Sequence, residues 1–298
     1  MAKLKREIIV GESRIYPYFF VSFATIYLIL FTSIPLLRGF WYSFTDSLLL
    51  NPREGKLVGT KNYKELLDNP EFYNSLSKTI IYATLVVIGS VALGTIAAIA
   101  INEKLPGRAL FRSLLTLPWA IPGVSVVLVF IWIYNYDSGV ANQFSSGLGF
   151  GQKGWLIDPS LGMFSVTLAS IWKVFPFIML VVLAALQSVP EELREAARVD
   201  GADRLNIFRT VVLPHLIPTL RIVSLLMTIW SIRRFEIIYL LTGGGPSGAT
   251  NNIVINVYKL AFENSELGKA AALGILGLLL SITVTLIYFF IDKRQEKN

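Results

Sequence analysis

The sequence offers few side chains that could perform covalent or metal chemistry. It contains no cysteine, and His215 is its single histidine. Thiolate nucleophiles, disulfides and Cys- or His-based metal clusters are therefore excluded. A phosphate-binding loop of the form GxxxxGKS or GxxxxGKT is also missing, because Gly243 to Gly245 are followed by proline rather than by lysine. We expect no catalytic residue, metal or cofactor, so any nucleotide hydrolysis must take place on another subunit.

The notable charged side chains lie within apolar segments. Arg233, Arg234 and Glu236 follow Trp230 in one such segment. Charged residues inside a membrane are costly and usually face protein or a water-filled cavity. On a continuous helix, Arg233 and Glu236 share a face and can pair, with Trp230 on the same side. Two alternatives stay open: the arginines extend to the membrane surface, or the Arg233–Glu236 pair joins two helices.

Aromatic side chains accompany these charges. A second apolar segment carries Trp172, Lys173, Phe175 and Phe177 around Pro176. A sugar site needs aromatic faces for C–H surfaces, together with fixed donors and acceptors for hydroxyls, and the two segments supply both. Trp and Phe near the ends of membrane spans are also common interface anchors, which is the alternative explanation.

The elements that carry these residues are predicted to be membrane helices. Hydrophobic residues make up 54% of the 298-residue chain and charged residues only 16%, with a mean hydropathy of +0.59. Soluble domains carry about 25% charged residues. A membrane helix needs about 20 mostly apolar residues. Barrel strands would instead show short segments of alternating polarity, which are not seen. Six segments qualify as spans: 16–40, 79–101, 114–134, 161–186, 217–240 and 267–291.

Lysine and arginine predict the orientation of the chain, whose net charge is +7. They are concentrated at both termini, in the loop near Arg108 and in the loop at 188–214. The positive-inside rule therefore places both termini in the cytoplasm. In the first outer loop, Asn62 with Glu65 has capping-box spacing, and Asn69-Pro70 predicts a second helix start. We interpret residues 1–298 as a single transmembrane domain.

The cytoplasmic loop at 188–214 has the strongest local signals. Ser188 is predicted to cap a helix that ends at Gly201, because glycine tolerates the left-handed conformation at a helix end. Asp203 is predicted to cap a second helix, which carries Leu205, Phe208 and Val212 along one stripe. The loop therefore predicts a stiff helix–turn–helix with small residues on its exposed surface.

The stretch EAARVDGADRLNIFRTVVLPHLIP, which begins at Glu195, resembles the EAA loop of bacterial and archaeal ABC importer permeases. The resemblance implies that this loop forms the coupling helix that docks in a groove of a partner ATPase. It also implies the type I, MetI-like permease fold. The residues that would transmit the motion of the ATPase are Glu195, Ala196, Ala197, Asp200, Gly201 and Ala202.

Other blocks resemble the maltose-type branch of these permeases, above all TGGGP at Thr242 to Pro246. Two departures are Glu236, where the branch often has aspartate, and a Ser/Gly-rich stretch at 145–149. In this branch the fourth to sixth spans line a sugar site. The resulting candidates for the substrate path are Trp172, Phe175, Trp230, Ser231, Arg233, Arg234 and Glu236.

The resemblance implies a permease subunit that carries a sugar, expected to be a di- or oligosaccharide, across the cytoplasmic membrane of a prokaryote by alternating access. Its implied partners are a second homologous permease in a heterodimer, two ATPase subunits and an extracytoplasmic binding protein, within the lipid bilayer; no nucleic acid is expected. An importer permease for glycerol phosphate or another polyol derivative is the nearest alternative. An ion-coupled secondary transporter is disfavoured because Glu236 is nearly the only carboxylate in the spans.

Overall fold

The computed structural model describes residues 15–103 and 106–295, and every regular element in these ranges is a helix. Five helical stretches are long and apolar enough to cross a membrane, and a bent pair of helices could form a sixth span. The prediction of an all-α membrane protein is therefore confirmed. Some of the lysines and arginines used to predict the orientation lie within 1–14, 104–105 and 296–298. These segments are outside the described residues.

The helices are α1 (Ile15–Leu28), α2 (Ile34–Tyr42), α3 (Lys61–Asp68), α4 (Pro70–Asn102), α5 (Arg108–Ala120), α6 (Gly123–Ile133), α7 (Val140–Gly147), α8 (Pro159–Gln187), α9 (Glu191–Val199), α10 (Arg204–Ile207), α11 (Leu213–Ile232), α12 (Glu236–Thr242), α13 (Ile253–Tyr258) and α14 (Leu267–Gln295). Short π-helical segments at Ile29–Ser33, Phe208–Val212 and Lys259–Glu263 continue neighbouring helices, and Pro52–Glu54 forms a 3-10 turn.

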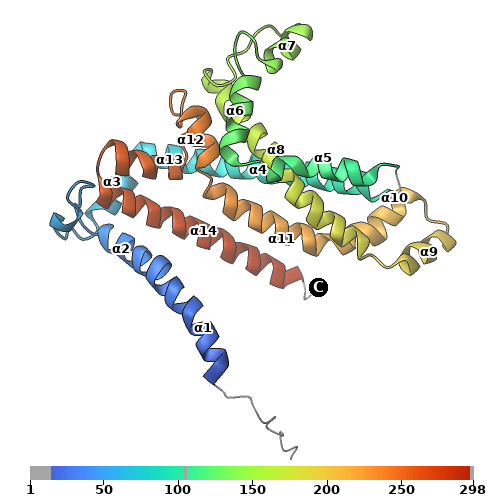
Figure 1. The fold of residues 1–298 in the computed structure, drawn as a ribbon, viewed down its shortest axis with the longest axis horizontal. Coiled ribbons are helices and arrows are strands. Elements are labelled where there is room, and N and C mark those ends of the chain that lie inside the picture. Colours follow the sequence, from blue (N-terminus) through green and yellow to red (C-terminus); the bar gives the residue numbers. More distant parts are fainter. Residues whose placement is uncertain (1–14, 104–105, 296–298) are drawn as a thin grey trace, which may run out of the picture.

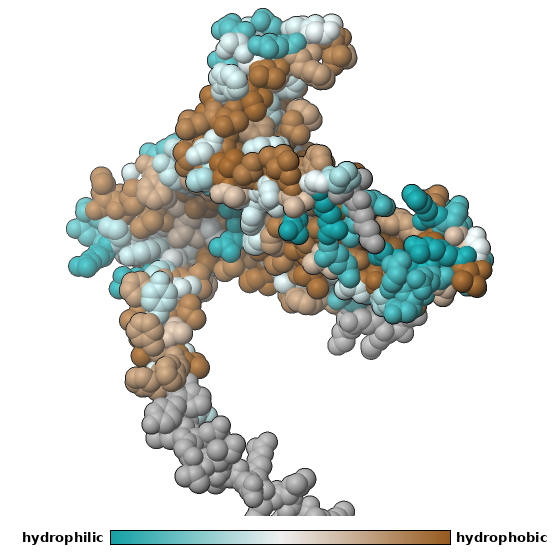
Figure 2. Space-filling model, turned by 45° about the vertical axis from the view of Figure 1, so that its right-hand side comes forward, coloured by the Kyte–Doolittle hydropathy of each residue, from teal (hydrophilic) through white to brown (hydrophobic). Residues whose placement is uncertain are grey.

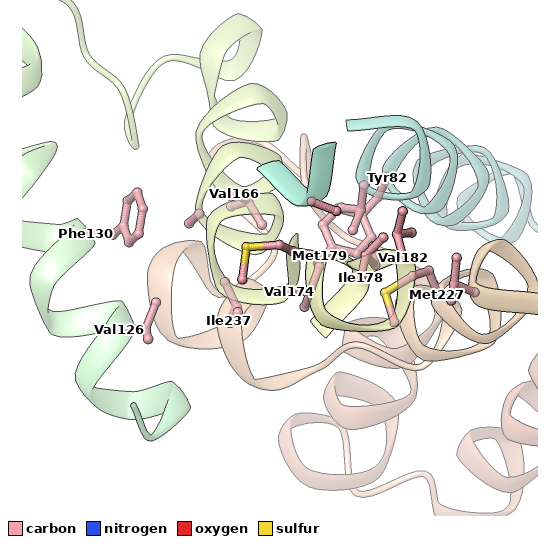
Figure 3. Close-up of a cluster of buried hydrophobic side chains, with 14 of the residues drawn as sticks. Tyr82, Val126, Phe130, Val166, Val174, Ile178, Met179, Val182, Met227 and Ile237 are labelled. Carbon is pink, nitrogen blue, oxygen red and sulfur yellow. The ribbon is translucent and has the colours of Figure 1, made fainter. Parts of the chain in front are cut away.

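The core of the molecule lies among α4, α8 and α11, which run side by side with α14 (Figure 1). Tyr82 of α4, Ile178 and Met179 of α8, and Met227 of α11 are almost fully buried there (Figure 3). The Tyr82 hydroxyl is hydrogen-bonded to Ser170 Oγ at 2.7 Å, which joins α4 to α8. Such polar contacts add to van der Waals packing, which drives helix association in a membrane.

Small residues let α4 and α8 approach closely. A Cβ added at Gly94 would lie 2.8 Å from Ile178 Cβ and 2.9 Å from the carbonyl oxygen of Phe175. One of these contacts is with backbone, so α8 itself would have to move. Glycine at this position is thus required by the neighbouring helix, as is common where membrane helices pack.

The predicted third span, 114–134, is not a continuous helix. It is replaced by α5 and α6, which meet at 98° across a short break. Pro122 lies in this break and has no N–H to bond to the carbonyl oxygen of Pro118, which favours a break of the helix at this position. Beyond the break, α6 and α7 form an arm that stands away from the bundle (Figure 1).

The predicted fifth span, 217–240, also ends early. Helix α11 stops at Ile232 and α12 begins at Glu236. Arg233 and Glu236 therefore do not share one helix face, and no ion pair joins them in the described part of the chain. The Asn252 side-chain amide donates to the Arg234 carbonyl at 3.2 Å, so a tertiary contact satisfies the backbone of this break.

The two helix starts predicted in the first connecting loop have different outcomes. Asn69 caps α4 by accepting a hydrogen bond from the Glu71 amide at 2.9 Å, as predicted. Asn62 does not cap a helix, because it lies within α3 and is buried. Its side-chain amide donates instead to the carbonyls of Ser43 (3.0 Å) and Thr45 (2.8 Å), which ties α3 to the end of α2.

Candidate functional sites

The predicted coupling loop lies at one end of the bundle, where α9 and α10 project from α8 and α11 (Figure 1). Helix α9 begins at Glu191 behind Pro190, and no side chain caps it. The prediction that Ser188 caps this helix is wrong, because its hydroxyl donates to the Ala185 carbonyl at the end of α8 and lies 3.1 Å from His215 Nε2. Ser188 therefore belongs to the end of the membrane helix.

The turn between α9 and α10 has the predicted geometry. Gly201 has φ +81°, the left-handed conformation that favours glycine. Its amide donates to the Arg198 carbonyl, and the Ala202 amide donates to the Ala197 carbonyl, both at 3.0 Å. This pattern satisfies carbonyls left free at the end of α9. Asp203 caps α10 by accepting from the Asn206 amide at 2.8 Å.

Arg194 fixes α9 against the membrane helix that precedes it. Its guanidinium donates to the Leu186 carbonyl at 3.1 Å and lies 3.5 Å from Glu191 Oε2. Its side chain is largely buried. This contact attaches the side of α9 that faces α8, and the opposite side of α9 is exposed.

The outer surface of the loop combines small, charged and apolar side chains. Glu195, Ala196, Asp200 and Gly201 are exposed, and Ala197 and Ala202 are half-buried. Three large apolar residues are also exposed: Leu193 (53%), Val199 (87%) and Leu205 (54%). The apolar stripe predicted from the sequence comprises Leu205, Phe208 and Val212, and we expected it to form the packed back of the loop. Val212 is buried and Phe208 is half-buried, so this prediction is wrong only for Leu205. Leu193 and Val199 were not identified from the sequence, although apolar residues on a strongly charged helix were a usable signal.

This apolar group lies within a hydrophilic end of the molecule. Hydrophilic residues gather over the end of the bundle that carries α9 and α10, whereas hydrophobic residues cover most of its length (Figure 2). Exposed Val199 and Leu205 within such a region form a surface suited to contact with another protein.

Among the predicted substrate-path residues, Trp230 lies in an aromatic cluster with two residues from other helices. Its ring stacks on Trp119 of α5 at 6.0 Å between centroids and lies 5.3 Å from Phe177 of α8. Trp119 and Phe177 are 5.2 Å apart. We refer to Trp119, Phe177 and Trp230 as the aromatic cluster. Trp119 and Trp230 are both partly exposed, so the cluster presents ring surface outward.

The other aromatic and hydroxyl candidates lie elsewhere. Trp172 packs edge-to-face against Phe130 of α6 at 5.5 Å. Phe175 and Ser231 are buried in the helix bundle. In the described part of the chain, no ring contact joins Trp172 or Phe175 to Trp230, and Ser231, which follows Trp230 in α11, is buried. Trp119 was not identified as a candidate because it is distant in sequence and reaches Trp230 only through the fold.

The three charged candidates for the substrate path have different surroundings. Arg233 is exposed, whereas Arg234 is half-buried and interacts with the buried Tyr82 hydroxyl. The Glu236 carboxylate lies against Gly123, the first residue of α6, where an added Cβ would collide with it. Arg234 thus contributes to packing, Arg233 faces outward and Glu236 lies beside the break between α5 and α6.

Lys173 occupies the other side of this break. Its Nζ donates to the carbonyl oxygens of Pro118 and Trp119, each at 3.0 Å, and also contacts that of Ile121. The ammonium lies 6.0 Å from the centre of the Trp119 ring. Lys173 and Phe177 are four residues apart on α8, so both face α5. Among the described residues, no group of three or more His, Cys, Asp or Glu side chains could hold a metal ion.

The chain is similar to permease subunits of known transport systems. The chain is 35% identical over 265 residues to the trehalose/maltose transport system permease protein MalF of Thermococcus litoralis, covering 89% of each chain. It is 31% identical over 273 residues to the sulfoquinovosyl glycerol transport system permease protein SmoG of Agrobacterium fabrum, covering 92% of this chain and 89% of that protein.

The fold matches crystal structures of a bacterial ABC transporter that imports the acidic polysaccharide alginate. One has a TM-score of 0.81 at 22% identity and covers 94% of this chain and 96% of that chain. A second, in complex with an alginate pentasaccharide-bound periplasmic protein, has a TM-score of 0.79 at 22% identity over 96% of both chains. Residues 90–297 match the family of binding-protein-dependent transport system inner membrane components. The resemblance found in the sequence is therefore confirmed, and the chain belongs to this family of ABC transporter permeases.

Proposed function

We propose that this protein is the membrane-spanning subunit of an ATP-driven importer that carries a di- or oligosaccharide by alternating access. The observation that carries the proposal is the α9–α10 loop, in which the complete EAA motif is held in a capped, rigid turn with exposed apolar residues around it. A permease that works without an ATPase has no use for such a docking surface.

The coupling role is assigned to the outer surface of that loop. Glu195, Ala196 and Gly201 would contact a groove of the ATPase, with Leu193 and Val199 buried at the interface. Burial of such side chains stabilises association by about 25 cal/mol per Å² of apolar surface. Arg194 joins α9 to the end of α8, so motion of the ATPase would reach the helix that carries Lys173 and Phe177. ATP hydrolysis is thereby assigned to a separate subunit.

The substrate path is assigned to the surface beside the aromatic cluster. Trp119 and Trp230 offer ring faces for the C–H surfaces of a pyranose, and Arg233 offers donors for hydroxyl groups. The name of the trehalose/maltose relative supports a sugar as substrate. Trp172, Phe175, Ser231, Arg234 and Glu236 stay as predictions for the same path, with less support from their positions.

The proposed partners follow from surfaces that this chain leaves open. The span Tyr18–Tyr42 has none of its apolar window buried against the rest of the chain. A second, homologous permease in a heterodimer would provide a protein surface for it, with the lipid bilayer around both. The alginate transporter complex with a periplasmic protein supports an extracytoplasmic binding protein as a further partner. Two ATPase subunits would complete the assembly, and both termini of this chain would lie in the cytoplasm.

The test is reconstitution of the complex. The tagged chain is purified in a mild detergent, its partners are identified, and the complex is placed in proteoliposomes with ATP on the side of the α9–α10 loop. We expect sugar uptake that needs both ATP and the binding protein. Uptake driven by an ion gradient without ATP would contradict the proposal and favour a secondary transporter.

A polyol derivative is the second candidate substrate. The observation that favours it is exposed Arg233, which forms no ion pair in the described part of the chain. The sulfoquinovosyl glycerol relative supports an anionic glycerol derivative. If glycerol phosphate inhibits sugar uptake, and if this inhibition is lost in Arg233→Gln, the result would favour this substrate class over a neutral sugar.

A further inference from the structure

We propose that Lys173 is a positioning residue that holds Trp119 in the aromatic cluster by satisfying the backbone at the break between α5 and α6. The proposal rests on the transport function proposed above. The last carbonyls of any helix lack partners within the helix. At the end of α5 the problem is greater, because Pro122 supplies no N–H and α6 leaves at 98°.

Unpaired backbone carbonyls are especially unfavourable inside a membrane, where each costs several kcal/mol. A lysine ammonium has three N–H donors and no acceptor. Lys173 uses them on the carbonyls of Pro118, Trp119 and Ile121. The number of donors therefore matches the number of contacted carbonyls, and no donor is left for a substrate. This makes Lys173 a part of the scaffold and not a substrate ligand.

The charges around the break match the two helix ends. A helix carries partial negative charge at its C-terminus and partial positive charge at its N-terminus. The Lys173 cation lies at the C-terminal end of α5, and the Glu236 carboxylate lies at Gly123, which begins α6. Glu236 attracts Lys173, whereas Arg234 repels it. Lys173 and Glu236 thus complement the two helix ends, which stabilises a bent span over a straight one.

The same contacts set the position of the Trp119 ring. Its carbonyl is held by Lys173, while its ring packs against Phe177, one helical turn further along α8. The stacked partner, Trp230, comes from the end of α11. Loss of the Lys173 contacts would free the end of α5 and separate Trp119 from Trp230, so the effect on the substrate would act through Trp119.

The first test measures the bend without any substrate. The chain has no cysteine, so Ser113→Cys and Leu128→Cys place two spin labels on exposed positions of α5 and α6 in the assembled complex. We expect Lys173→Met to broaden or shift the distance distribution between the labels and Lys173→Arg to keep most of it. An unchanged distribution in Lys173→Met overturns the proposal. If that variant does not assemble, Lys173→Gln is measured against the same criterion.

The second test measures the substrate. We expect Lys173→Met to raise the half-saturating sugar concentration by about tenfold, in line with the strength of aromatic contacts, with a smaller change in maximal rate. Trp119→Leu should have a similar effect, and the double variant should be no worse than either single variant, because both changes act on one ring. Additive effects would contradict action through Trp119.

Lys269→Met serves as the matched control, because Lys269 pairs with Glu65 and Glu266 far from the break. It should leave the label distances and the sugar dependence unchanged. If the wild-type complex carries no sugar, the proposed function fails. The label distances then still decide whether Lys173 holds the bend.

Discussion

Gly201 in the α9–α10 loop and Gly94 in helix α4 are both needed, but for different physical reasons. Gly201 has a left-handed backbone, and a Cβ added there would meet nothing within 4 Å. Gly94 lies in an ordinary helix, and an added Cβ would collide with Ile178 and with the backbone of Phe175. The first requirement comes from the chain's own conformation and the second from a neighbouring helix.

This difference separates two regions of the protein. The turn between α9 and α10 is made by local hydrogen bonds, each between residues three to five positions apart. The packed helices and the break between α5 and α6 are made by contacts across the chain, such as those from Lys173 to α5. A substitution in the loop should therefore disturb coupling, whereas one in the packed region should disturb the fold.

The largest effect is expected for Gly94→Leu. Overpacking a tight interface costs about 3 kcal/mol or more when backbone must move. We expect a large fall in the thermal midpoint and in the yield of monodisperse protein in detergent. Gly274→Leu is the control, because a Cβ at Gly274 in α14 would meet nothing within 4 Å. Equal stability of the two variants would show that α4 and α8 are not packed as described.

Gly201→Val should act differently. A β-branched residue in the left-handed region is strained by about 1–2 kcal/mol, but the strain is confined to an exposed turn. We expect little change in the thermal midpoint and loss of substrate-stimulated ATPase activity in the assembled complex. Gly201→Asn tolerates this conformation and should keep most of the stimulation. Full ATPase stimulation in Gly201→Val would contradict the proposal that the α9–α10 loop couples the permease to the ATPase.

Asp203→Ala tests the cap of α10. Loss of a helix cap costs about 1 kcal/mol, and here only the short α10 helix depends on it. We expect hydrogen exchange of the Asn206 amide to rise about fivefold while exchange in α8 stays unchanged. Asp203→Asn keeps the acceptor and should restore protection. Faster exchange throughout α8 would mean that the loop is not locally stabilised.

The smallest effect is expected from a surface contact outside both regions. Lys269 donates to Glu65 and holds the pKa of that carboxyl below its usual range. A lowered pKa in the folded state stabilises the protein above the unfolded pKa of about 4.3, and this contribution is lost as pH falls through the folded value. Glu65→Gln should slightly reduce the drop in thermal midpoint between pH 6 and pH 4, in low salt. A steeper drop would contradict the assignment.

Much of the α9–α10 loop could be predicted from the sequence because its signals are local. Gly201 and Asp203 fix the turn and the cap through atoms within three residues of each. Ser188 failed as a predicted cap because its hydroxyl is engaged at the end of α8, next to His215 of another helix. Leu205 failed because a period of 3.6 residues identifies a face but does not say whether another element covers it.

Apolar composition predicted helices across most of the chain, but it did not predict where they break. In the third span, Pro122 lies at the break, yet the 98° angle depends on Lys173 and Glu236, which are distant in sequence. In the fifth span, the break at Arg233 involves the side chain of Asn252. Pairing of Arg233 with Glu236, which the sequence allowed, required a continuous helix. Because the helix breaks between them, the two side chains do not share a face.

The sequence by itself determined the helical membrane class, the family and the capped turn between α9 and α10, because low charge, apolar length and local hydrogen bonding act within short segments. Only the tertiary structure decided that Trp119, Phe177 and Trp230 form one cluster, that Lys173 supports it and that Phe175 is buried. These arrangements depend on which helices pack together and at what angle. The packing and the angle are determined by side chains whose partners lie tens of residues away, so a local sequence pattern cannot predict them.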